Sequence, residues 1–472
     1  MAAPQIVWFR NDLRLADQAA VRAAAAAGPV VAVYVLDDAT PGKWRPGAAK
    51  RWWLHYSLTA LARDLKHMGG QLILRRGRPA VELAAVAKAT GAKAVHALHH
   101  YEPWAIGEEA AVAQALELTL HDGAYLAPPG TTRSGSGTPY RIFTPYWNAL
   151  QEVMPPGDPE PAPMVRFADA PPGDDLDDWK LSPRDPDWAG GFDVWTPGEA
   201  GAHAALDAFA EVAGDYDHGR NFPARPLTSR LSPHLHHGEI SPAQVWAVIN
   251  GGGAGASTYR REIGWRDFGI NLVLQFPRIG DEPNRLQFDA FPFRDDPAGL
   301  AAWRRGQTGY PIVDAGMRQL RATGWMHNRV RMIVASFLTK HLLIDWRRGE
   351  RWFWDCLVDA DYGNNSLGWQ WIMGSGVDSS PFNRIFTPVG QSEKFDAGGV
   401  YIREWVRELA KLPNDAIHAP WTAPPGVLAA AGVVLGTTYP HPIVDHAAAR
   451  ARALAAYATI KSPAVPSAHQ SR

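Results

Sequence analysis

The sequence predicts two structural parts: an α/β domain built on a doubly wound parallel sheet, followed by a larger all-α domain. Two observations lead to this fold class. Over residues 1–130, short apolar runs alternate with Ala-rich segments of helical composition, a pattern typical of parallel sheets covered by helices. Beyond residue 200 the strand-like runs fade and apolar residues recur at helical spacing. A chain of 472 residues also exceeds a single hydrophobic core.

The first part is expected to contain five strands with helices between them. The apolar runs predict strands at 5–9, 30–36, 71–75, 93–98 and about 117–121. The Ala-rich segments predict helices at 16–27, 48–67, 79–90 and 105–116. No GxGxxG follows the first strand, and GGGAG at 251–255 lacks the GK[ST] ending of a phosphate-binding loop. A dinucleotide dehydrogenase or a P-loop enzyme is therefore disfavoured.

Residues 131–200 are rich in Pro, Gly and Asp, and this composition predicts a connection that crosses the surface between two domains. Residues 201–472 are expected to form the helical domain. Apolar spacing predicts its helices at 201–212, 242–249, 257–274, 298–306, 311–322, 327–345, 350–358 and 400–410.

Composition narrows the class of protein. A net charge of −1 excludes a uniformly basic nucleic-acid coat but allows a local basic patch. The single cysteine, Cys356, cannot form an internal disulfide or a thiolate zinc site, so an intracellular, cytoplasmic location is expected. The N-terminus has no signal-peptide pattern, and no apolar run approaches the roughly 18 residues of a membrane span. The 20 Trp residues suggest core packing, stacking platforms or electron transfer.

The stretch 359–371, DADYGNNSLGWQW, concentrates carboxylates, amides and indoles. Its Gly and Asn residues predict a loop. Asn364, Asn365, Trp369 and Trp371 fit a wall around a large, flat ligand with polar edges, and an aromatic-capped turn without a ligand is the alternative. A divalent metal at the DxD pair is disfavoured because no His or Glu cluster accompanies it.

A basic run occupies residues 315–344, which contain no Asp or Glu. Asn328, Arg331 and Met332 share one face of a helix in this run. A run of one sign suits phosphates, and a solvated basic face is the alternative. The buried stripe of the same helix is predicted at Val330, Ile333, Val334, Phe337 and Leu338.

Two further segments carry side chains suited to chemistry. On the predicted helix 257–272, Glu262, Trp265 and Arg266 lie on one face. Glu262 serves there either as a hydrogen-bond donor with a raised pKa or as the partner of Arg266 in a surface ion pair. TSRLS at 228–232 fits either a phosphate cradle or an ordinary helix N-cap.

Taken together, these motifs resemble the photolyase/cryptochrome family over nearly the whole chain, and bacterial cyclobutane pyrimidine dimer photolyases most of all. The matching segments are WFRNDLRLAD at 8–17, RIFTPYW at 141–147, TSRLSPHLHHGEISP at 228–242, TGYPIVDAGMRQLRATGWMHNRVRMIVASFL at 308–338, GWQW at 368–371 and FNRIFTPVGQSEKFD at 382–396.

The resemblance implies FAD bound in a folded shape within the helical domain. Arg331 is expected to pair with Asp359 close to the flavin ring, and Asn365 to face flavin N5. Plant cryptochromes have Asp at the position of Asn365, so the Asn favours repair. The positions carried over as cofactor contacts are Tyr216, Thr228, Ser229, Arg230, Leu231, Ser232, Tyr259, Glu262, Arg266, Asn328, Arg331, Asp359, Asp361 and Asn365.

The activity implied is light-driven electron transfer from reduced FAD into a cyclobutane pyrimidine dimer flipped out of UV-damaged DNA. Glu262 is expected at the carbonyl edge of the dimer. In (6-4) photolyases two histidines stand where this chain has Asn328 and Met332, which favours the cyclobutane dimer. The expected substrate and DNA contacts are Trp265, Asn328, Arg329, Met332, Trp371, Arg384, Gln391 and Lys394.

Two accessory systems are also implied by the resemblance. Trp369, Trp346 and Trp303 coincide with the electron-relay triad of the family, with Trp369 nearest the flavin and Trp303 expected at the surface. The relay would re-reduce oxidised FAD under light. An antenna chromophore is expected near HHYEPW at 99–104, with methenyltetrahydrofolate favoured over 8-hydroxy-5-deazaflavin.

A cryptochrome-type blue-light receptor is the alternative function, and a (6-4) photolyase is a lesser one. Plant and animal receptors usually carry a long C-terminal extension, whereas the last helical pattern here ends near Lys461, about eleven residues before the final residue. The enzyme is therefore the expectation. It is expected to be a monomer that acts on damaged DNA and does not involve a membrane.

Overall fold

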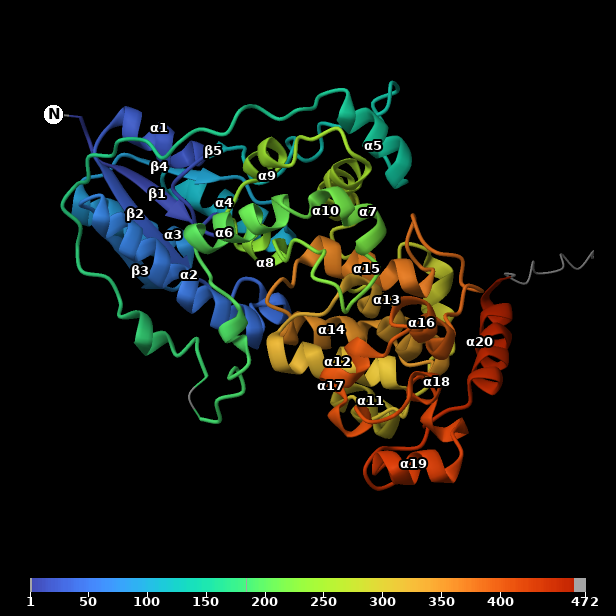
Figure 1. Cartoon of the computed structure of the whole chain (residues 1–472). Coiled ribbons are helices and arrows are strands. Elements are labelled where there is room, and N and C mark those ends of the chain that lie inside the picture. The colour runs from blue at the N-terminus through green and yellow to red at the C-terminus, as the bar shows by residue number, and fades with distance from the viewer. Residues whose placement is uncertain (1, 184, 462–472) are drawn as a thin grey trace, which may run out of the picture.

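The computed structural model describes residues 2–183 and 185–461 and has the two expected parts (Figure 1). The first is a five-stranded parallel sheet with strand order β3-β2-β1-β4-β5. Residues 1, 184 and 462–472, which belong to the expected domain and connection ranges, lie outside the described residues. The strands are β1 Gln5–Phe9, β2 Val30–Leu36, β3 Leu72–Arg76, β4 Ala94–Leu98 and β5 Glu117–His121.

Helices connect the strands of this sheet at nearly the positions that the sequence predicts. They are α1 Ala19–Ala27, α2 Ala48–His67, α3 Pro79–Thr90 and α4 Pro103–Ala115. Every residue of β1 and β2 is buried, because a sheet covered on both sides needs apolar side chains on both faces. Ile6 in β1 stands opposite Val31 in β2 and Val95 in β4.

The second part is helical and holds the largest hydrophobic core. In Figure 1 it lies beside the sheet domain, and α20 packs at its far edge. Its helices are α6 Glu199–Ala210, α7 Tyr216–Gly219, α8 Ser232–His237, α9 Pro242–Val248, α10 Ala254–Gln275, α11 Pro297–Arg305, α12 Pro311–Thr323, α13 Asn328–Ser336, α14 Trp346–Cys356, α15 Tyr362–Met373, α16 Pro388–Phe395, α17 Val400–Trp405, α18 Asn414–Ile417, α19 Pro425–Ala431 and α20 His446–Lys461.

The prediction of a single helix over 327–345 is wrong in its second half. α13 gives way after Ser336 to a π-helix, Phe337–His341, and Leu343 adopts a left-handed φ of 54° just beyond it. Lys340 lies in this wider turn and donates to the backbone oxygens of Phe382 and Arg384, each at 3.0 Å. The predicted stripe of the helix is buried: Val330, Ile333, Val334, Phe337 and Leu338.

The prediction of a loop over 359–371 is wrong for most of its length, because residues 362–371 belong to helix α15. Asp361 caps the helix: its Oδ1 accepts hydrogen bonds from the backbone N–H of Asn364 at 2.8 Å and from the Asn364 amide at 2.7 Å. A Cβ on Gly363 would lie 3.0 Å from the backbone carbon of Gly269 in α10. The Asn and Gly residues therefore serve a helix cap and a close contact between two helices.

The connection between the two parts contains a helix, α5 Phe143–Gln151, within the range expected as a linker. In Figure 1, α5 lies on the side of α7 and α10, and the chain then runs along the outside of the sheet. Helix α10 also holds the start of the connection. Asp267 Oδ1 accepts hydrogen bonds from the backbone N–H groups of Leu126 and Ala127 at 2.7 and 3.3 Å.

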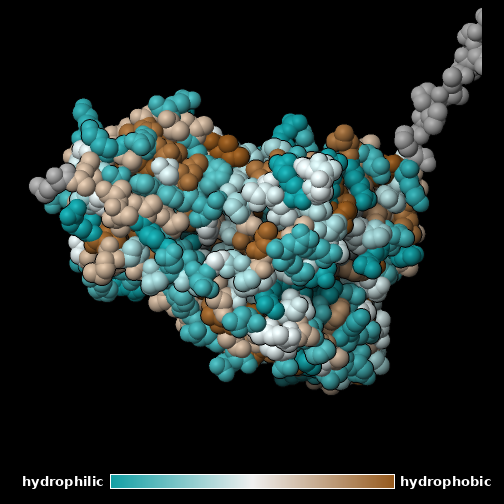
Figure 2. Space-filling view, turned by 90° about the horizontal axis from the view of Figure 1, so that it is seen from above, coloured by the Kyte–Doolittle hydropathy of each residue, from teal (hydrophilic) through white to brown (hydrophobic). Residues whose placement is uncertain are grey.

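The surface is mostly hydrophilic on the face shown in Figure 2, where hydrophobic residues form small separate groups. In the part of the chain that the structure describes, no helix has the length and apolar character required to cross a membrane.

Candidate active site

The helical part contains a cavity of about 530 Å³, within the range of roughly 300–1,000 Å³ typical of small-molecule sites. Helices α10, α13 and α15 supply most of its walls. The contributions of these helices are Tyr259, Glu262, Ile263, Trp265 and Arg266 from α10, Asn328, Arg331, Met332 and Ala335 from α13, and Asn364, Asn365, Leu367, Gly368, Trp369, Trp371 and Ile372 from α15.

Most of the positions expected to contact a cofactor border this one cavity. Three do not: Ser229, Arg230 and Leu231. Ser229 Oγ accepts a hydrogen bond from the Tyr259 hydroxyl at 2.9 Å, and Arg230 lies over the rings of Trp195 and Trp325. The positions that border the cavity are Tyr216, Thr228, Ser232, Tyr259, Glu262, Arg266, Asn328, Arg331, Asp359, Asp361 and Asn365.

Asn365 and Gly368 lie one turn apart on the cavity side of α15. The Asn365 amide donates to the backbone oxygen of Glu350 at 3.1 Å, which fixes the amide and leaves Oδ1 as an available acceptor. Within residues 2–183 and 185–461, no atom lies within 4 Å of a Cβ added at Gly368, apart from its chain neighbours and the local helix backbone. A mid-helix Gly costs about 1 kcal/mol relative to Ala, and packing does not require it here. Gly368 is exposed and borders the cavity, so the open space beside it can accept a ligand.

An ion pair forms the floor of the cavity, as expected for Arg331 and Asp359. Arg331 Nη2 lies 3.1 and 2.8 Å from the two carboxylate oxygens of Asp359. Ser232 Oγ also donates to Asp359 Oδ2, at 2.6 Å. Hydrogen bonds of this kind to an ionised group are stronger than neutral ones, so α8, α13 and the segment before α15 are held together at this point.

Asp361 is a second carboxylate in the same wall. Burial opposes its ionisation, but the hydrogen bond from His236 and the nearby charge of Arg266 outweigh burial and hold the pKa of Asp361 below its usual range. His236 Nδ1 lies 3.5 Å from Asp361 Oδ2. Burial lowers the pKa of His236 to about 4, so the ring is neutral at pH 7 and the carboxylate is charged.

His236 borders the cavity and was not found by sequence reasoning. Its Nε2 is buried and has no hydrogen-bond partner within residues 2–183 and 185–461. A buried polar atom without a partner is costly, and at a cavity wall it fits a polar group of a ligand. The segment HLHH at 234–237 offered the residue type, but its alignment with Asp361 depends on the tertiary fold.

Glu262 does not pair with Arg266, so the surface ion pair considered for these two residues is wrong. Glu262 is bonded by Arg220 from the segment after α7. Arg266 instead donates to the backbone oxygens of Ala124 and Leu235 at 2.6 and 3.2 Å. Arg220 is a second cavity residue that the sequence reasoning missed. Its position four residues after Tyr216 was the available signal.

The positions expected to enclose a lesion also meet at this cavity. Trp265, Asn328, Met332 and Trp371 all border it, and both indoles are half-buried. The expected phosphate contacts lie outside its lining: Arg329, Arg384, Gln391 and Lys394. Arg329 donates to Asn221 Oδ1 at 2.6 Å, and Arg384 and Lys394 are exposed.

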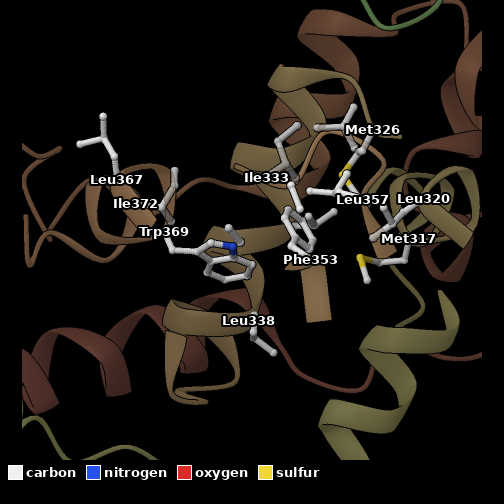
Figure 3. Packing of buried hydrophobic residues seen from close by; sticks show 14 of the residues in the cluster. Met317, Leu320, Met326, Ile333, Leu338, Phe353, Leu357, Leu367, Trp369 and Ile372 are labelled. Atoms are coloured by element: carbon white, nitrogen blue, oxygen red, sulfur yellow. The ribbon is translucent and has the colours of Figure 1, made fainter. Parts of the chain in front are cut away.

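The three Trp residues expected as a relay are all buried, and the surface position predicted for Trp303 is wrong. Trp303 is 0% exposed, because α11 turns it inward, where its indole N–H donates to the backbone oxygen of Val334 at 3.0 Å. Its ring lies 6.3 Å from that of Trp369. Phe353 contacts both rings. Figure 3 shows Trp369 and Phe353 among buried aliphatic side chains. Trp346 is 1% exposed.

A smaller hollow of about 110 Å³ lies at the carboxyl ends of β1 and β2, where open α/β sheets bind ligands. The expected antenna segment 99–104 contributes His100, Glu102 and Trp104 to its wall. His236 borders both hollows. The ring of Trp104 packs on Tyr362, at 5.1 Å between centroids. The space left is below the roughly 300 Å³ of a small-molecule site.

Comparison with known proteins agrees with the fold. Residues 5–165 match the family model described as DNA photolyase, and residues 259–459 match the one described as the FAD binding domain of DNA photolyase. The deoxyribodipyrimidine photo-lyase of Agrobacterium fabrum is 50% identical, over 97% of this chain and 98% of that protein. Cryptochrome-1 of Arabidopsis thaliana is 37% identical, over 95% of this chain and 69% of that protein.

A solved structure gives the same result at the level of the fold. The crystal structure of a bacterial class III photolyase from Agrobacterium tumefaciens superposes with a TM-score of 0.94 at 49% identity, covering 98% of each chain. The five-stranded parallel sheet domain followed by a helical FAD-binding domain is the photolyase fold. The chain belongs to the DNA photolyase family.

Proposed function

We propose that the protein acts on the cyclobutane form of the pyrimidine dimer, with FAD and the flipped dimer sharing the 530 Å³ cavity. The chain is a photolyase, and photolyases of this kind repair pyrimidine dimers. The observation that carries the proposal is one cavity bordered by two half-buried indoles, Trp265 and Trp371, and by Glu262, Asn328 and Met332.

FAD supplies the photoexcited electron donor when it is bound, as the family resemblance implies. The residues of the chain bind and orient it. Asn365 Oδ1 is the acceptor available for a ring N–H, since its amide nitrogen is already committed to Glu350. Arg331, held by Asp359, places a cation beside the same wall, and Gly368 leaves the space that a flat ring requires.

The dimer would lie between the indoles while the Arg220–Glu262 pair reads its polar edge. A thymine edge presents one N–H donor between two carbonyl acceptors. Glu262 can accept from the N–H, and the guanidinium of Arg220 can donate to a carbonyl oxygen where negative charge develops. Trp265 and Trp371 exclude water and stack on the bases. The dimer pairs poorly in duplex DNA, so flipping it costs less than flipping intact bases.

Asn328 and Met332 support the cyclobutane dimer over the (6-4) lesion. Both border the cavity, and the resemblance places two histidines at these positions in (6-4) photolyases. A cryptochrome-type receptor is the second candidate function, since the plant Cryptochrome-1 is 37% identical. Asn365, where plant cryptochromes have Asp, favours repair.

An antenna chromophore is a separate part of the proposal. Two hollows, of about 110 and 240 Å³, are bordered by residues of the segment 99–104, and both are below the roughly 300 Å³ of a small-molecule site. No step of repair is therefore assigned to an antenna. The absorption spectrum of the purified protein tests whether the folate expected from the resemblance, the deazaflavin or neither is bound.

The decisive experiment illuminates purified, reduced protein with oligonucleotides that contain one defined lesion. Recovery of thymine absorbance is expected with the cyclobutane dimer and not with the (6-4) lesion, and not in the dark. Recovery with the (6-4) lesion alone would reverse the substrate assignment. Absence of recovery with either lesion, in protein that retains FAD, would favour the receptor. We also propose a cytoplasmic monomer, which light scattering after size-exclusion chromatography tests.

A further inference from the structure

We infer that Phe143 and Asp378 are positioning residues for Trp265, which they hold in one plane as a wall of the lesion site. The inference rests on the proposed function and deepens it. It gives a role to the motif RIFTPYW at 141–147, which includes Phe143 and does not itself border the cavity.

Phe143 supports the face of Trp265. The two rings are stacked, with centroids 3.7 Å apart and planes 9° apart. The ring of Trp147 lies 6.2 Å from that of Phe143 and within 16° of parallel. Phe143 is 1% exposed, so it is held in the core between its two aromatic neighbours. Trp265 is half-buried because it also borders the cavity.

Asp378 fixes the end of the helix that carries Phe143. Its Oδ2 accepts the backbone N–H of Phe143, the first residue of α5, at 2.7 Å. Ile142, the residue before it, offers no side-chain cap. The first N–H groups of a helix lack partners within the helix, and a carboxylate there is also favoured by the helix dipole. Asp378 therefore supplies the cap from a segment 235 residues away.

Helix α5 and the residues just before it are also bonded to α10, the helix that carries Trp265. Asn271 Nδ2 donates to the Tyr146 hydroxyl at 3.0 Å, and Gln275 Nε2 donates to the Tyr140 backbone oxygen at 2.9 Å. A Cβ on Gly264 would lie 2.4 Å from the Trp147 ring, so the helices are in close contact beside Trp265. The backbone that carries Phe143 is therefore held against the helix that carries Trp265.

A fixed indole plane has a functional consequence at a site that receives a flipped base pair. A half-buried Trp without support could rotate into the space meant for the lesion, and the ligand would then have to reorder it at a cost in affinity. Stacking on Phe143 fixes the ring beforehand. A binding site gains precision when packing locks the rotamers of its contact residues.

The first test compares dimer affinity in the FAD-loaded wild type and the Phe143→Leu variant. Loss of one aromatic stacking pair is expected to weaken binding of dimer-containing DNA by about threefold to tenfold, with FAD content and affinity for undamaged DNA unchanged. Phe192→Leu is the matched control, because Phe192 is also 1% exposed but packs on Trp52 and Trp188. It is expected to leave dimer affinity unchanged.

The Asp378 variants test the same arrangement without altering the core. Asp378→Ala is expected to weaken dimer binding in the same direction as Phe143→Leu. Asp378→Asn is expected to restore it, because the Asn oxygen still accepts the N–H of Phe143. Equal dimer affinity in Asp378→Ala and wild type would overturn the role of Asp378.

A double-mutant cycle separates positioning from general packing. If Phe143 acts through Trp265, Phe143→Leu has no further effect on dimer affinity in a Trp265→Ala background. The same loss in both backgrounds, or loss of bound FAD from Phe143→Leu, would assign Phe143 to general packing and overturn the inference. A wild type that does not prefer dimer DNA would instead contradict the proposed function itself.

Discussion

Glu262 shows how far the role of one residue depends on its neighbours. Its own helix offered Arg266 as a partner, yet the carboxylate is held by Arg220 and Arg266 is used to bind backbone oxygens. Glu262→Ala is therefore expected to lower the repair yield by about tenfold or more, because it removes a charged hydrogen bond to the dimer, worth up to about 3 kcal/mol, and releases the Arg220 guanidinium that faces the developing charge. Bound FAD should be retained, which its absorbance per protein measures. FAD loss in this variant would assign Glu262 to the cofactor.

The proposed electron relay can be tested at a single side chain, Trp303. Its indole ring packs against that of Trp369. Trp303→Phe is expected to slow photoreduction of oxidised FAD severalfold while sparing repair by chemically reduced enzyme. The flavin absorbance under blue light measures the rate. Trp421→Phe, which removes an indole packed on Tyr310, is the control. An unchanged rate in Trp303→Phe would remove it from the relay.

The candidate site could be predicted in part from single residues. The Arg331–Asp359 pair and the cavity positions of Asn328 and Met332 follow from the family motif, and all are present. Arg220 and His236 were missed because their partners, Glu262 and Asp361, lie on other elements. The burial of Trp303 could not be read from its own helix, since it depends on α13 packing over it.

At the scale of elements, the loop prediction for α15 failed because Asn364 takes part in the helix cap and Gly363 allows a close contact with α10. Residue propensities do not include such tertiary roles. Gly368→Ala tests another such role, at the cavity wall. The flavin-free variant is expected to be more stable than wild type by about 0.5–1 kcal/mol, because Ala favours helix over Gly. Its FAD content should nevertheless fall, since the new methyl group would enter the cavity. Chemical denaturation and flavin absorbance measure the two effects, and a stable variant with full FAD content would contradict the assigned space.

The hydrogen bonds from Leu126 and Ala127, in the segment after β5, to Asp267 of α10 predict a pH effect on stability. Burial raises the pKa of Asp267 to about 7, above the unfolded value of about 3.9. The folded state therefore binds a proton more tightly than the unfolded state, and the stability that this adds is present below pH 4 and lost as pH rises to 7.

Asp267→Asn tests this effect, because the Asn oxygen can still accept from Leu126 and Ala127 without titrating. The stability of the variant relative to wild type is expected to increase from pH 4 to pH 7 and to stay level above that. Denaturant midpoints across this range measure it. A difference that does not change with pH would show that Asp267 is already ionised in the folded protein.

At the scale of the whole molecule, the net charge is −1, so electrostatic attraction to DNA must come from a local group of basic residues rather than from the overall charge. Dimer affinity is expected to fall with salt by about 0.9 power of salt concentration for each phosphate contact. Arg384→Ala should reduce that slope by about one. Arg78→Ala, an exposed residue at the start of α3 in the sheet domain, should leave it unchanged. Binding titrations at several salt concentrations measure the slope, and equal slopes for all three proteins would remove Arg384 from the DNA contacts.

The fold class and the two-part order could be predicted because they rest on periodicity. Strands 5–9 and 30–36 and helices 48–67 and 79–90 have the predicted bounds. The sequence could not reveal that α5 in the connection joins the core of the helical part, because its Phe143 and Trp147 are buried against residues far along the chain. The π-helix at 337–341 is also a tertiary outcome, with Lys340 drawn toward the backbone of Phe382 and Arg384.

The near-contact of Gly269 and Gly363 sets the spacing of two cavity walls by main chain alone. A Cβ at Gly363 would meet backbone atoms of Gly269 and Ile270 at 3.0 to 3.2 Å, so α10 and α15 would have to move slightly apart. The backbone therefore helps to set the width of the cavity, whereas the side chains that line it determine which groups of a ligand it can bind. A larger residue in place of Gly363 would therefore alter the width of the cavity before any lining side chain changed.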